Sequence, residues 1–255
     1  MPKIICLCIL AILTNYWVFG NSIEKRWMPT VRLDTLKLYD QKRQRVIPIA
    51  IYKPPIESKK TKPRIVIFSH GYGQNKGGDY LCYSYLTEFL ATKGFWVVSI
   101  QHELETDSLL PLTGIPQVVR RPFWERGAEN ILFVINTLKK TNPYLDYTNI
   151  TLIGHSNGGD MTALFPEKYP NRVKKIITLD NRRMPLPKAN NLQVYSLRSS
   201  DQPADAGVLQ TEREIKKFRI KIIKLNNTTH NEMDDHANDE QRRAIQQYLL
   251  MFLNQ

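Results

Sequence analysis

The strongest constraint on the fold of this chain is a short glycine-rich motif past its middle. Residues 154–159 read Gly-His-Ser-Asn-Gly-Gly, so Ser156 stands at the centre of a Gly-x-Ser-x-Gly pattern. An apolar run typical of a β-strand precedes the motif at 150–153, and a helix-compatible stretch follows it at 160–165. Strand, sharp turn and helix in this order hold a serine Oγ exposed above the end of a parallel sheet. The glycines suit such a turn because a Cβ would clash with the closely approaching helix.

The rest of the chain alternates strand and helix patterns. Strands are predicted at 31–39, 46–52, 65–69, 95–101, 150–153, 173–179, 192–197 and 220–225, and helices at 79–93, 125–140, 160–165, 210–218 and 239–253. This alternation predicts an α/β fold with a mostly parallel central sheet and helices on both faces. Ligands bind beyond the carboxyl ends of such strands, so the loops that carry Gly71, Ser156, Asp180, Asp201 and His230 are expected to meet there.

The N-terminus resembles a secretory signal peptide. A basic start with Lys3 precedes a compact apolar run at 4–13, and small residues lie near position 22. We therefore predict a signal peptide at 1–22, a single domain at 23–255, and an exported protein in the periplasm or outside the cell. The alternative is an uncleaved membrane anchor, because residues 16–19 extend the apolar run.

Cysteine and histidine spacing argues against disulfides and metals. Cys6 and Cys8 lie in the leader, which leaves Cys82 alone in the mature chain and excludes an internal disulfide. Cys82 lies on a predicted helix face and is expected to be a buried structural thiol rather than a nucleophile. No spacing of cysteine and histidine matches a metal site, so no metal or other cofactor is predicted.

The chain is basic, with a formal net charge of +12. The charge is spread over many segments and forms no stripe with interleaved aromatic residues, which argues against nucleic-acid binding. Two interpretations remain open: weak association with an anionic envelope surface, or an ordinary solvated basic surface.

A serine hydroxyl becomes a good nucleophile only when a base takes its proton, and a third group must hold that base. His230 follows the last predicted strand and is the expected base, with His236 as its rival. His155 is expected to pack beneath the turn and His70 to be structural. His102 is expected to line the pocket.

The acid that holds the base is ambiguous. Asp201 follows the strand at 192–197 and is preferred narrowly. Asp180 follows the strand at 173–179 and is the alternative acid, with Asp205 as a weaker third candidate. The carboxylates that do not fill this role are expected to brace loops, for instance by pairing with Arg182 or Arg183.

Acyl transfer also needs N–H donors aimed at the developing oxyanion. The amide of Asn157, the residue after the nucleophile, is one expected donor. The amide of Tyr72 is the other, because Gly71 and Gly73 leave the loop after 65–69 free to turn it towards Ser156.

These motifs resemble the α/β-hydrolase superfamily over essentially all of the mature chain. The match is carried by the residues at 68–73, by the elbow at 154–159 and by His230. Within the superfamily the chain looks most like two groups that have no large cap domain. The polyester hydrolases and cutinases share Tyr72 and Asp201, and the platelet-activating-factor acetylhydrolases share a Leu-Asp pair at 179–180.

The resemblance implies an exported serine esterase that needs no cofactor and takes a small-molecule ester. The chain has Asn-Arg-Arg at 181–183 where the polyester hydrolases have an aromatic clamp, and it lacks their C-terminal disulfide. Few residues separate 179 from 192, so no lid domain fits there, which favours short acyl groups. Two other functions stay open: a peptidase or amidase that uses the same residues, and a non-catalytic binding protein on a hydrolase scaffold.

Overall fold

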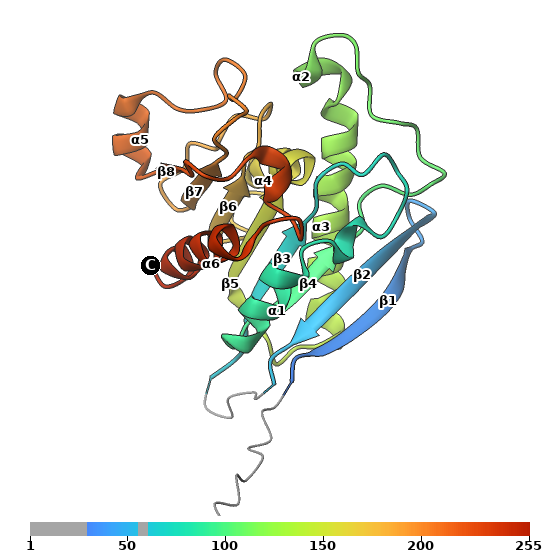
Figure 1. The fold of residues 1–255 in the computed structure, drawn as a ribbon. Helices are drawn as coiled ribbons and strands as arrows, with labels where there is room; N and C mark the ends of the chain where they lie inside the picture. The colour runs from blue at the N-terminus through green and yellow to red at the C-terminus, as the bar shows by residue number, and fades with distance from the viewer. Residues whose placement is uncertain (1–29, 56–60) are drawn as a thin grey trace, which may run out of the picture.

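An eight-stranded sheet runs through the molecule (Figure 1). It is seen in a computed structural model that describes residues 30–55 and 61–255. The strands are β1 (Arg32–Asp40), β2 (Arg45–Lys53), β3 (Arg64–Ser69), β4 (Trp96–Ile100), β5 (Asp146–His155), β6 (Lys175–Leu179), β7 (Gln193–Arg198) and β8 (Lys221–Lys224). Their order is β1-β2-β4-β3-β5-β6-β7-β8. β1 and β2 pair antiparallel, as do β2 and β4, and all other neighbours are parallel.

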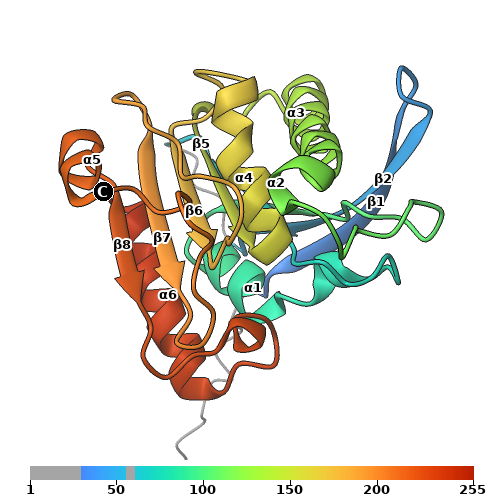
Figure 2. The same cartoon turned by 90° about the horizontal axis from the view of Figure 1, so that it is seen from above.

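Helices cover both faces of the sheet (Figure 2). The α-helices are α1 (Ser84–Thr92), α2 (Pro116–Val119), α3 (Arg121–Thr141), α4 (Ser156–Lys168), α5 (Glu212–Phe218) and α6 (Asp239–Leu253), with 3₁₀ turns η1 (Asp79–Leu81) and η2 (His230–Glu232). α1 and α6 bury their apolar sides on one face, and α3 and α4 lie on the other. The predicted α/β class, with a mostly parallel sheet between helices, is confirmed.

Burial on both faces explains why the central strands read as apolar runs rather than as alternating patterns. Every residue of β4 and β6 is buried, and so is β3 after its first residue. A strand that met water on one face would have needed polar residues at alternate positions.

Several helix boundaries differ from the sequence-based prediction: α4, for example, is Ser156–Lys168 rather than 160–165. The helix predicted at 79–93 is divided into η1 and α1. α3 begins at Arg121 rather than at 125, and the short α2, which the sequence pattern did not indicate, precedes it. α2 starts with Pro116 at a position where proline needs no N–H partner, which explains a helical turn in a stretch with little periodicity.

Within the described part of the chain, no helix combines the length and the apolar character that a membrane span requires. The predicted signal peptide at 1–22, and the anchor that is its alternative, lie outside the described residues.

Candidate active site

Ser156 stands at the point where β5 turns into α4. Its φ of 52° is in the left-handed region, which is strained for a residue with a side chain. Two glycines allow the turn. A Cβ on Gly154 would lie 2.3 Å from the carbonyl oxygen of Gly158, and a Cβ on Gly158 would lie 2.3 Å from that of His70. The elbow thus needs these glycines because helix, turn and β3 come into backbone contact.

His230 and Asp180 complete a chain of contacts that begins at Ser156. The Ser156 Oγ lies 2.8 Å from His230 Nε2, and His230 Nδ1 lies 2.5 Å from Asp180 Oδ2. The carboxylate accepts a hydrogen bond, so Nδ1 carries the proton and Nε2 is free to accept from the serine hydroxyl. The three side chains come from the loops after β5, β6 and β8, which meet at the carboxyl edge of the sheet as expected.

Asp180 is fully buried and is held from several sides. Ser199 donates to it through its backbone N–H (3.0 Å) and its hydroxyl (2.8 Å), and Arg198 Nη2 forms an ion pair with it at 2.9 Å. Burial raises the pKa of Asp180, but the hydrogen bond from His230, the Arg198 charge and the Ser199 donors outweigh burial and bring this pKa below its ordinary value. The carboxylate is therefore ionised at neutral pH.

The prediction that Asp201 is the acid that holds the ring of His230 is wrong. Its carboxylate accepts a hydrogen bond from the backbone N–H of His230 at 2.7 Å, whereas Asp180 holds the ring. The structure thus brings the alternative acid, Asp180, to the histidine and uses Asp201 to brace its loop. Asp205 does not contact His230: its carboxylate accepts a hydrogen bond from Gln117 Nε2 of α2 at 3.1 Å.

The other histidines have distinct surroundings. His236 is exposed and bonds Asp234 through Nδ1 at 2.8 Å. His155 is buried beneath the turn, as expected. His102 was expected to line the pocket, but it is buried and bonds Ser69 Oγ through Nε2 at 3.0 Å. That expectation was wrong, because His102 is not among the residues that line the cavity beside Ser156.

His70 holds the peptide group that links Gly71 and Tyr72. Its Nδ1 donates to the carbonyl oxygen of Gly71 at 2.6 Å, while its Nε2 accepts from the backbone N–H of His102 at 3.0 Å. The Tyr72 N–H belongs to the same peptide plane as that carbonyl, so the bond from His70 determines the direction of this N–H. Tyr72 is tied down further, because its hydroxyl accepts from the backbone N–H of Leu110 at 2.9 Å.

Asn157 is fixed by two buried partners. Its Nδ2 donates to Glu103 Oε1 at 2.9 Å, and its Oδ1 accepts from the indole N–H of Trp124 at 2.8 Å. Burial raises the pKa of Glu103. Glu103 and Trp124 are not predicted from the sequence, because neither belongs to a local motif and both contact Asn157 only through the fold.

Solved structures resemble this chain closely in fold and weakly in sequence. A Pyrococcus horikoshii acylaminoacyl peptidase superposes with a TM-score of 0.62 at 15% identity, over 89% of this chain and 41% of that one. An esterase from Pyrobaculum calidifontis has a TM-score of 0.62 at 15% identity, over 88% and 85%. An α/β serine hydrolase without a lid, from Xanthomonas campestris, has a TM-score of 0.59 at 12% identity, over 87% and 94%.

The chain has the α/β-hydrolase fold. It spans about two fifths or less of the peptidase structures it matches, so it corresponds to one part of those longer proteins. No protein-family model matches the sequence, and a search of curated proteins finds no match. These likenesses establish the fold, and the activity has to be argued from the site.

A cavity of roughly 280 Å³ opens beside Ser156. The side chains that line it include Tyr72, Asp79, Tyr83, His230, Asp234 and His236. Cys82, which was expected to be a buried structural thiol, is exposed and lies at the same cavity. The predicted helix is interrupted between η1 and α1, and Cys82 is exposed because it lies at this interruption.

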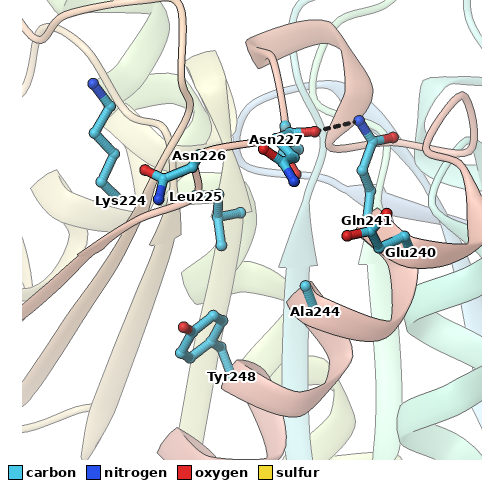
Figure 3. Close-up of a pocket in the computed structure, with 9 residues that line it drawn as sticks. Lys224, Leu225, Asn226, Asn227, Glu240, Gln241, Ala244 and Tyr248 are labelled. Atoms are coloured by element: carbon cyan, nitrogen blue, oxygen red, sulfur yellow. Dashed lines mark hydrogen bonds between the residues drawn. The ribbon is translucent and has the colours of Figure 1, made fainter.

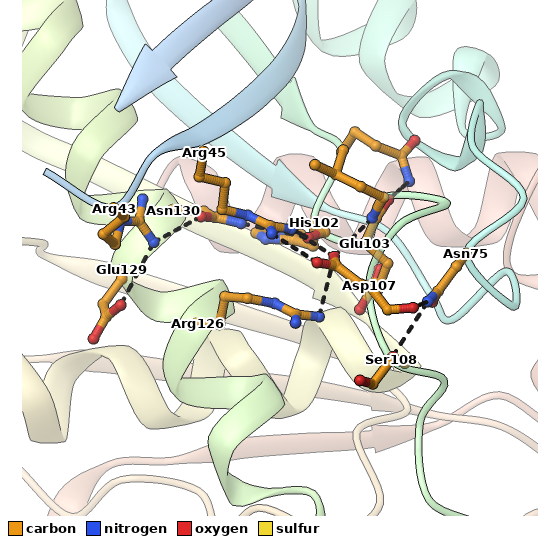
Figure 4. A network of polar contacts seen from close by, with 12 residues as sticks. Arg43, Arg45, Asn75, His102, Glu103, Asp107, Ser108, Arg126, Glu129 and Asn130 are labelled. Carbon is orange, nitrogen blue, oxygen red and sulfur yellow. Dashed lines mark hydrogen bonds and ion pairs between the residues drawn. The ribbon is translucent and has the colours of Figure 1, made fainter. Parts of the chain in front are cut away.

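The loop that runs from β4 to α2 contacts Tyr72 through the N–H of Leu110 and Asn157 through Glu103, and Asp107 anchors it (Figure 4). Arg45 of β2 holds Asp107 with two bonds of 2.8 and 2.7 Å, and Arg126 of α3 approaches it at 3.4 Å. Asn75 donates to the backbone carbonyl of Asp107 at 2.8 Å. These contacts attach the loop to β2 and α3.

A second cavity, of roughly 190 Å³, lies between the end of β8 and α6 (Figure 3). Asn227 and Gln241 face each other across it, and Gln241 Nε2 donates to the carbonyl of Asn227 at 2.7 Å. Ser156, His230 and Asp180 do not line this second cavity. Over residues 30–55 and 61–255, no group of three or more metal-binding side chains is found.

Proposed function

We propose that this protein is a serine hydrolase that cleaves carboxylic esters through an acyl-enzyme on Ser156. The observation that carries the proposal is the unbroken series of contacts from Ser156 Oγ through the ring of His230 to Asp180. A buried, ionised carboxylate, an imidazole of defined tautomer and a hydroxyl on a strained turn are together what nucleophilic acyl transfer requires.

The geometry indicates how each group would act. His230 Nε2 takes the proton of Ser156 as Oγ attacks the ester carbonyl, and Asp180 stabilises the imidazolium that forms. His230 then gives the proton to the departing alkoxide, which leaves the acyl group on Ser156. A water molecule, deprotonated by the same histidine, attacks the acyl-enzyme and releases the acid, and the proton returns to Ser156.

The tetrahedral intermediates carry a negative oxygen, and we assign its two donors to the backbone amides of Asn157 and Tyr72. The bond from His70 to the Gly71 carbonyl supports this assignment, because it orients the Tyr72 amide in advance. The side-chain bonds of Asn157 do the same for the start of α4. Loss of one such donor costs about 2.7–4 kcal/mol of activation free energy in other hydrolases.

The size of the cavity beside Ser156, roughly 280 Å³, supports a preference for short acyl groups. Ser156, His230 and Asp180 could equally act in a peptidase or amidase. An acylaminoacyl peptidase is among the matched structures, which supports that alternative. A non-catalytic scaffold is disfavoured, because nucleophile, base and acid are all in contact.

The test is a panel of p-nitrophenyl acetate and butyrate beside the matching p-nitroanilides, with Ser156→Ala as the control. We expect turnover of the esters, acetate or butyrate ahead of longer chains, and none in the variant. Preferential cleavage of the anilides would support the amidase alternative, and inertness of the wild type towards all substrates would support the scaffold.

Export and weak association with an anionic envelope surface are also proposed. The charge of +12 supports the second of these. Four apolar side chains in the loop from β4 to α2 and in α2 itself support it too, because each is at least 65% exposed: Leu109, Leu112, Ile115 and Val118. Co-sedimentation with phosphatidylglycerol vesicles, against phosphatidylcholine vesicles, tests it. Binding should fall when Leu112 becomes serine and should be unchanged when Leu36, exposed on β1, becomes serine. Equal binding to both lipids would contradict the proposed association.

Mass spectrometry of the secreted chain tests whether the proposed signal peptide is cleaved after residue 22.

A further inference from the structure

A buried tyrosine and a buried histidine join the three loops of the site. The backbone N–H of Gly71 donates to the hydroxyl of Tyr83 at 3.0 Å, and this hydroxyl lies 2.7 Å from His155 Nδ1. The other ring nitrogen of His155, Nε2, lies 3.1 Å from the carbonyl oxygen of His230. The series starts one residue before Tyr72, passes the residue before Ser156 and ends on the backbone of His230.

The direction of each bond follows from its partners. A carbonyl oxygen only accepts, so Nε2 of His155 must carry the proton that is shared with His230. Burial, reinforced by the positive charge that His230 acquires, lowers the pKa of His155 to about 3, so the ring is neutral and its Nδ1 is an acceptor. The Tyr83 hydroxyl therefore donates to Nδ1 and accepts from Gly71.

The surrounding packing leaves this arrangement little freedom. Tyr83 and His155 are 4% and 5% exposed, and the rings of His155 and His230 lie 4.7 Å apart between centroids. A Cβ on Gly71 would lie 3.0 Å from His155 Nδ1 and 3.2 Å from the Tyr83 hydroxyl. A side chain here would push these groups away by a few tenths of an ångström. A displaced partner would also leave a buried donor or acceptor unpaired, which is unfavourable.

We propose that Tyr83 and His155 are positioning residues that keep the Tyr72 amide, Ser156 and His230 in register for the attack on the substrate. The proposal rests on the hydrolase function proposed above. Neither residue needs to touch the substrate for this. Tyr83 holds the loop of Tyr72 through the N–H of Gly71, and His155 holds the loop of His230 through the carbonyl oxygen of His230. Both loops are thus fixed relative to the turn that carries Ser156.

The experiment compares Tyr83→Phe and His155→Leu with His155→Gln, whose amide can both donate and accept. As a matched control, Tyr195→Phe removes a hydroxyl that bonds Gln255 at the other end of the sheet. We expect Tyr83→Phe and His155→Leu to lower kcat for p-nitrophenyl acetate about 10- to 100-fold with little change in KM, below the loss caused by removing a whole oxyanion donor. Affinity for a trifluoromethyl ketone, which forms an oxyanion, should fall in parallel, and His155→Gln should recover much of both.

Unchanged kcat and ketone affinity in Tyr83→Phe would overturn the proposal, and so would losses that only follow the thermal stability of each variant. A readout that needs no turnover separates this from failure of the proposed function. In ¹⁵N NMR of Ser156→Ala, His155 should be the Nε2–H tautomer, and its Nδ1 signal should shift when Tyr83 becomes phenylalanine. An inert wild type with this signature would reject the hydrolase and keep the contacts; an Nδ1–H tautomer would reject the contacts themselves.

Discussion

At the scale of single residues, the site depends on which groups surround His230. Two aspartates approach this histidine, one at the ring and one at the backbone, and a second histidine lies at the same cavity. Sequence position alone could not distinguish them, because all follow strands that end at the same edge. Their hydrogen-bond partners do distinguish them.

Asp180→Asn should lower kcat by about 10³- to 10⁴-fold, because an amide in place of the carboxylate favours the wrong tautomer of His230. Asp201→Asn should cost less than about tenfold, since its amide oxygen can still accept from the His230 backbone. Steady-state kinetics on p-nitrophenyl acetate would decide this, and a greater loss in the Asp201 variant would contradict the assignment.

His230→Ala should reduce kcat by about 10⁴- to 10⁶-fold, as the loss of a triad base does elsewhere. His236→Ala should leave kcat nearly unchanged, because its ring is exposed and faces Asp234. The two variants can be compared in one assay. Similar losses in both would mean that the base has been assigned to the wrong histidine.

At the scale of elements, α4 is joined to the loop after β6 by a buried carboxylate. Asp160 Oδ1 accepts from the backbone N–H groups of Arg183 and Met184, at 2.9 and 2.8 Å. Asp201 does brace a loop, as expected, but its partner is the His230 backbone and not Arg182 or Arg183. Burial raises the pKa of Asp160 to about 6, although the bonds from Arg183 and Met184 lower it.

This raised pKa gives a prediction about stability and pH. The folded protein binds the proton of Asp160 more tightly than the unfolded chain, whose carboxyl titrates near 3.8. This contribution to stability is therefore complete below about pH 4 and is lost as the pH rises through 6, with a size on the order of 2–3 kcal/mol. Asp160→Asn should remove it while keeping the acceptor oxygen.

Urea unfolding of both proteins between pH 4.5 and 8 measures the effect, with Asp239→Asn on the exposed start of α6 as a control. The wild type should lose stability relative to Asp160→Asn as the pH rises. A constant difference between the two would show that Asp160 does not titrate in this range.

At the scale of the whole molecule, β2 holds the loop that runs from β4 to α2. Arg45 of β2 and Asp107 of this loop form a pair whose side chains are only 12% and 10% exposed. Breaking a buried pair by removing one partner leaves an unpaired charge and typically costs about 3–5 kcal/mol. Arg45→Met or Asp107→Asn should thus destabilise the protein by about 3 kcal/mol, the low end of this range, because both groups retain some solvent and a second partner: Arg126 for Asp107, and the His102 carbonyl for Arg45.

The double variant should cost less than the two single losses together, because the contact between Arg45 and Asp107 is lost in each single variant and can be lost only once. Thermal or urea unfolding of all four proteins gives the interaction free energy directly. Additive losses would show that Arg45 and Asp107 act independently and that the loop is held by its other contacts.

The sequence was sufficient to predict the layers of the fold and the elbow, because each rests on a local pattern. It was sufficient to pair Ser156 with His230 because both follow strands that end at the same edge of the sheet. The contacts that refine the site are not local. Asn157 meets Glu103, and His155 meets Tyr83, across separations of 54 and 72 residues. The choice between Asp180 and Asp201 has the same origin: both loops reach His230, and only the packing shows which carboxylate reaches its ring.

The central claim is that Ser156 is a nucleophile activated by His230 and Asp180, and covalent labelling tests it most directly. The wild type should react with a fluorophosphonate, and peptide mapping should place the adduct on Ser156. Ser156→Ala should stay unlabelled, and Asp180→Asn should be labelled far more slowly. An unlabelled wild type, or an adduct on another residue that persists in Ser156→Ala, would contradict the account.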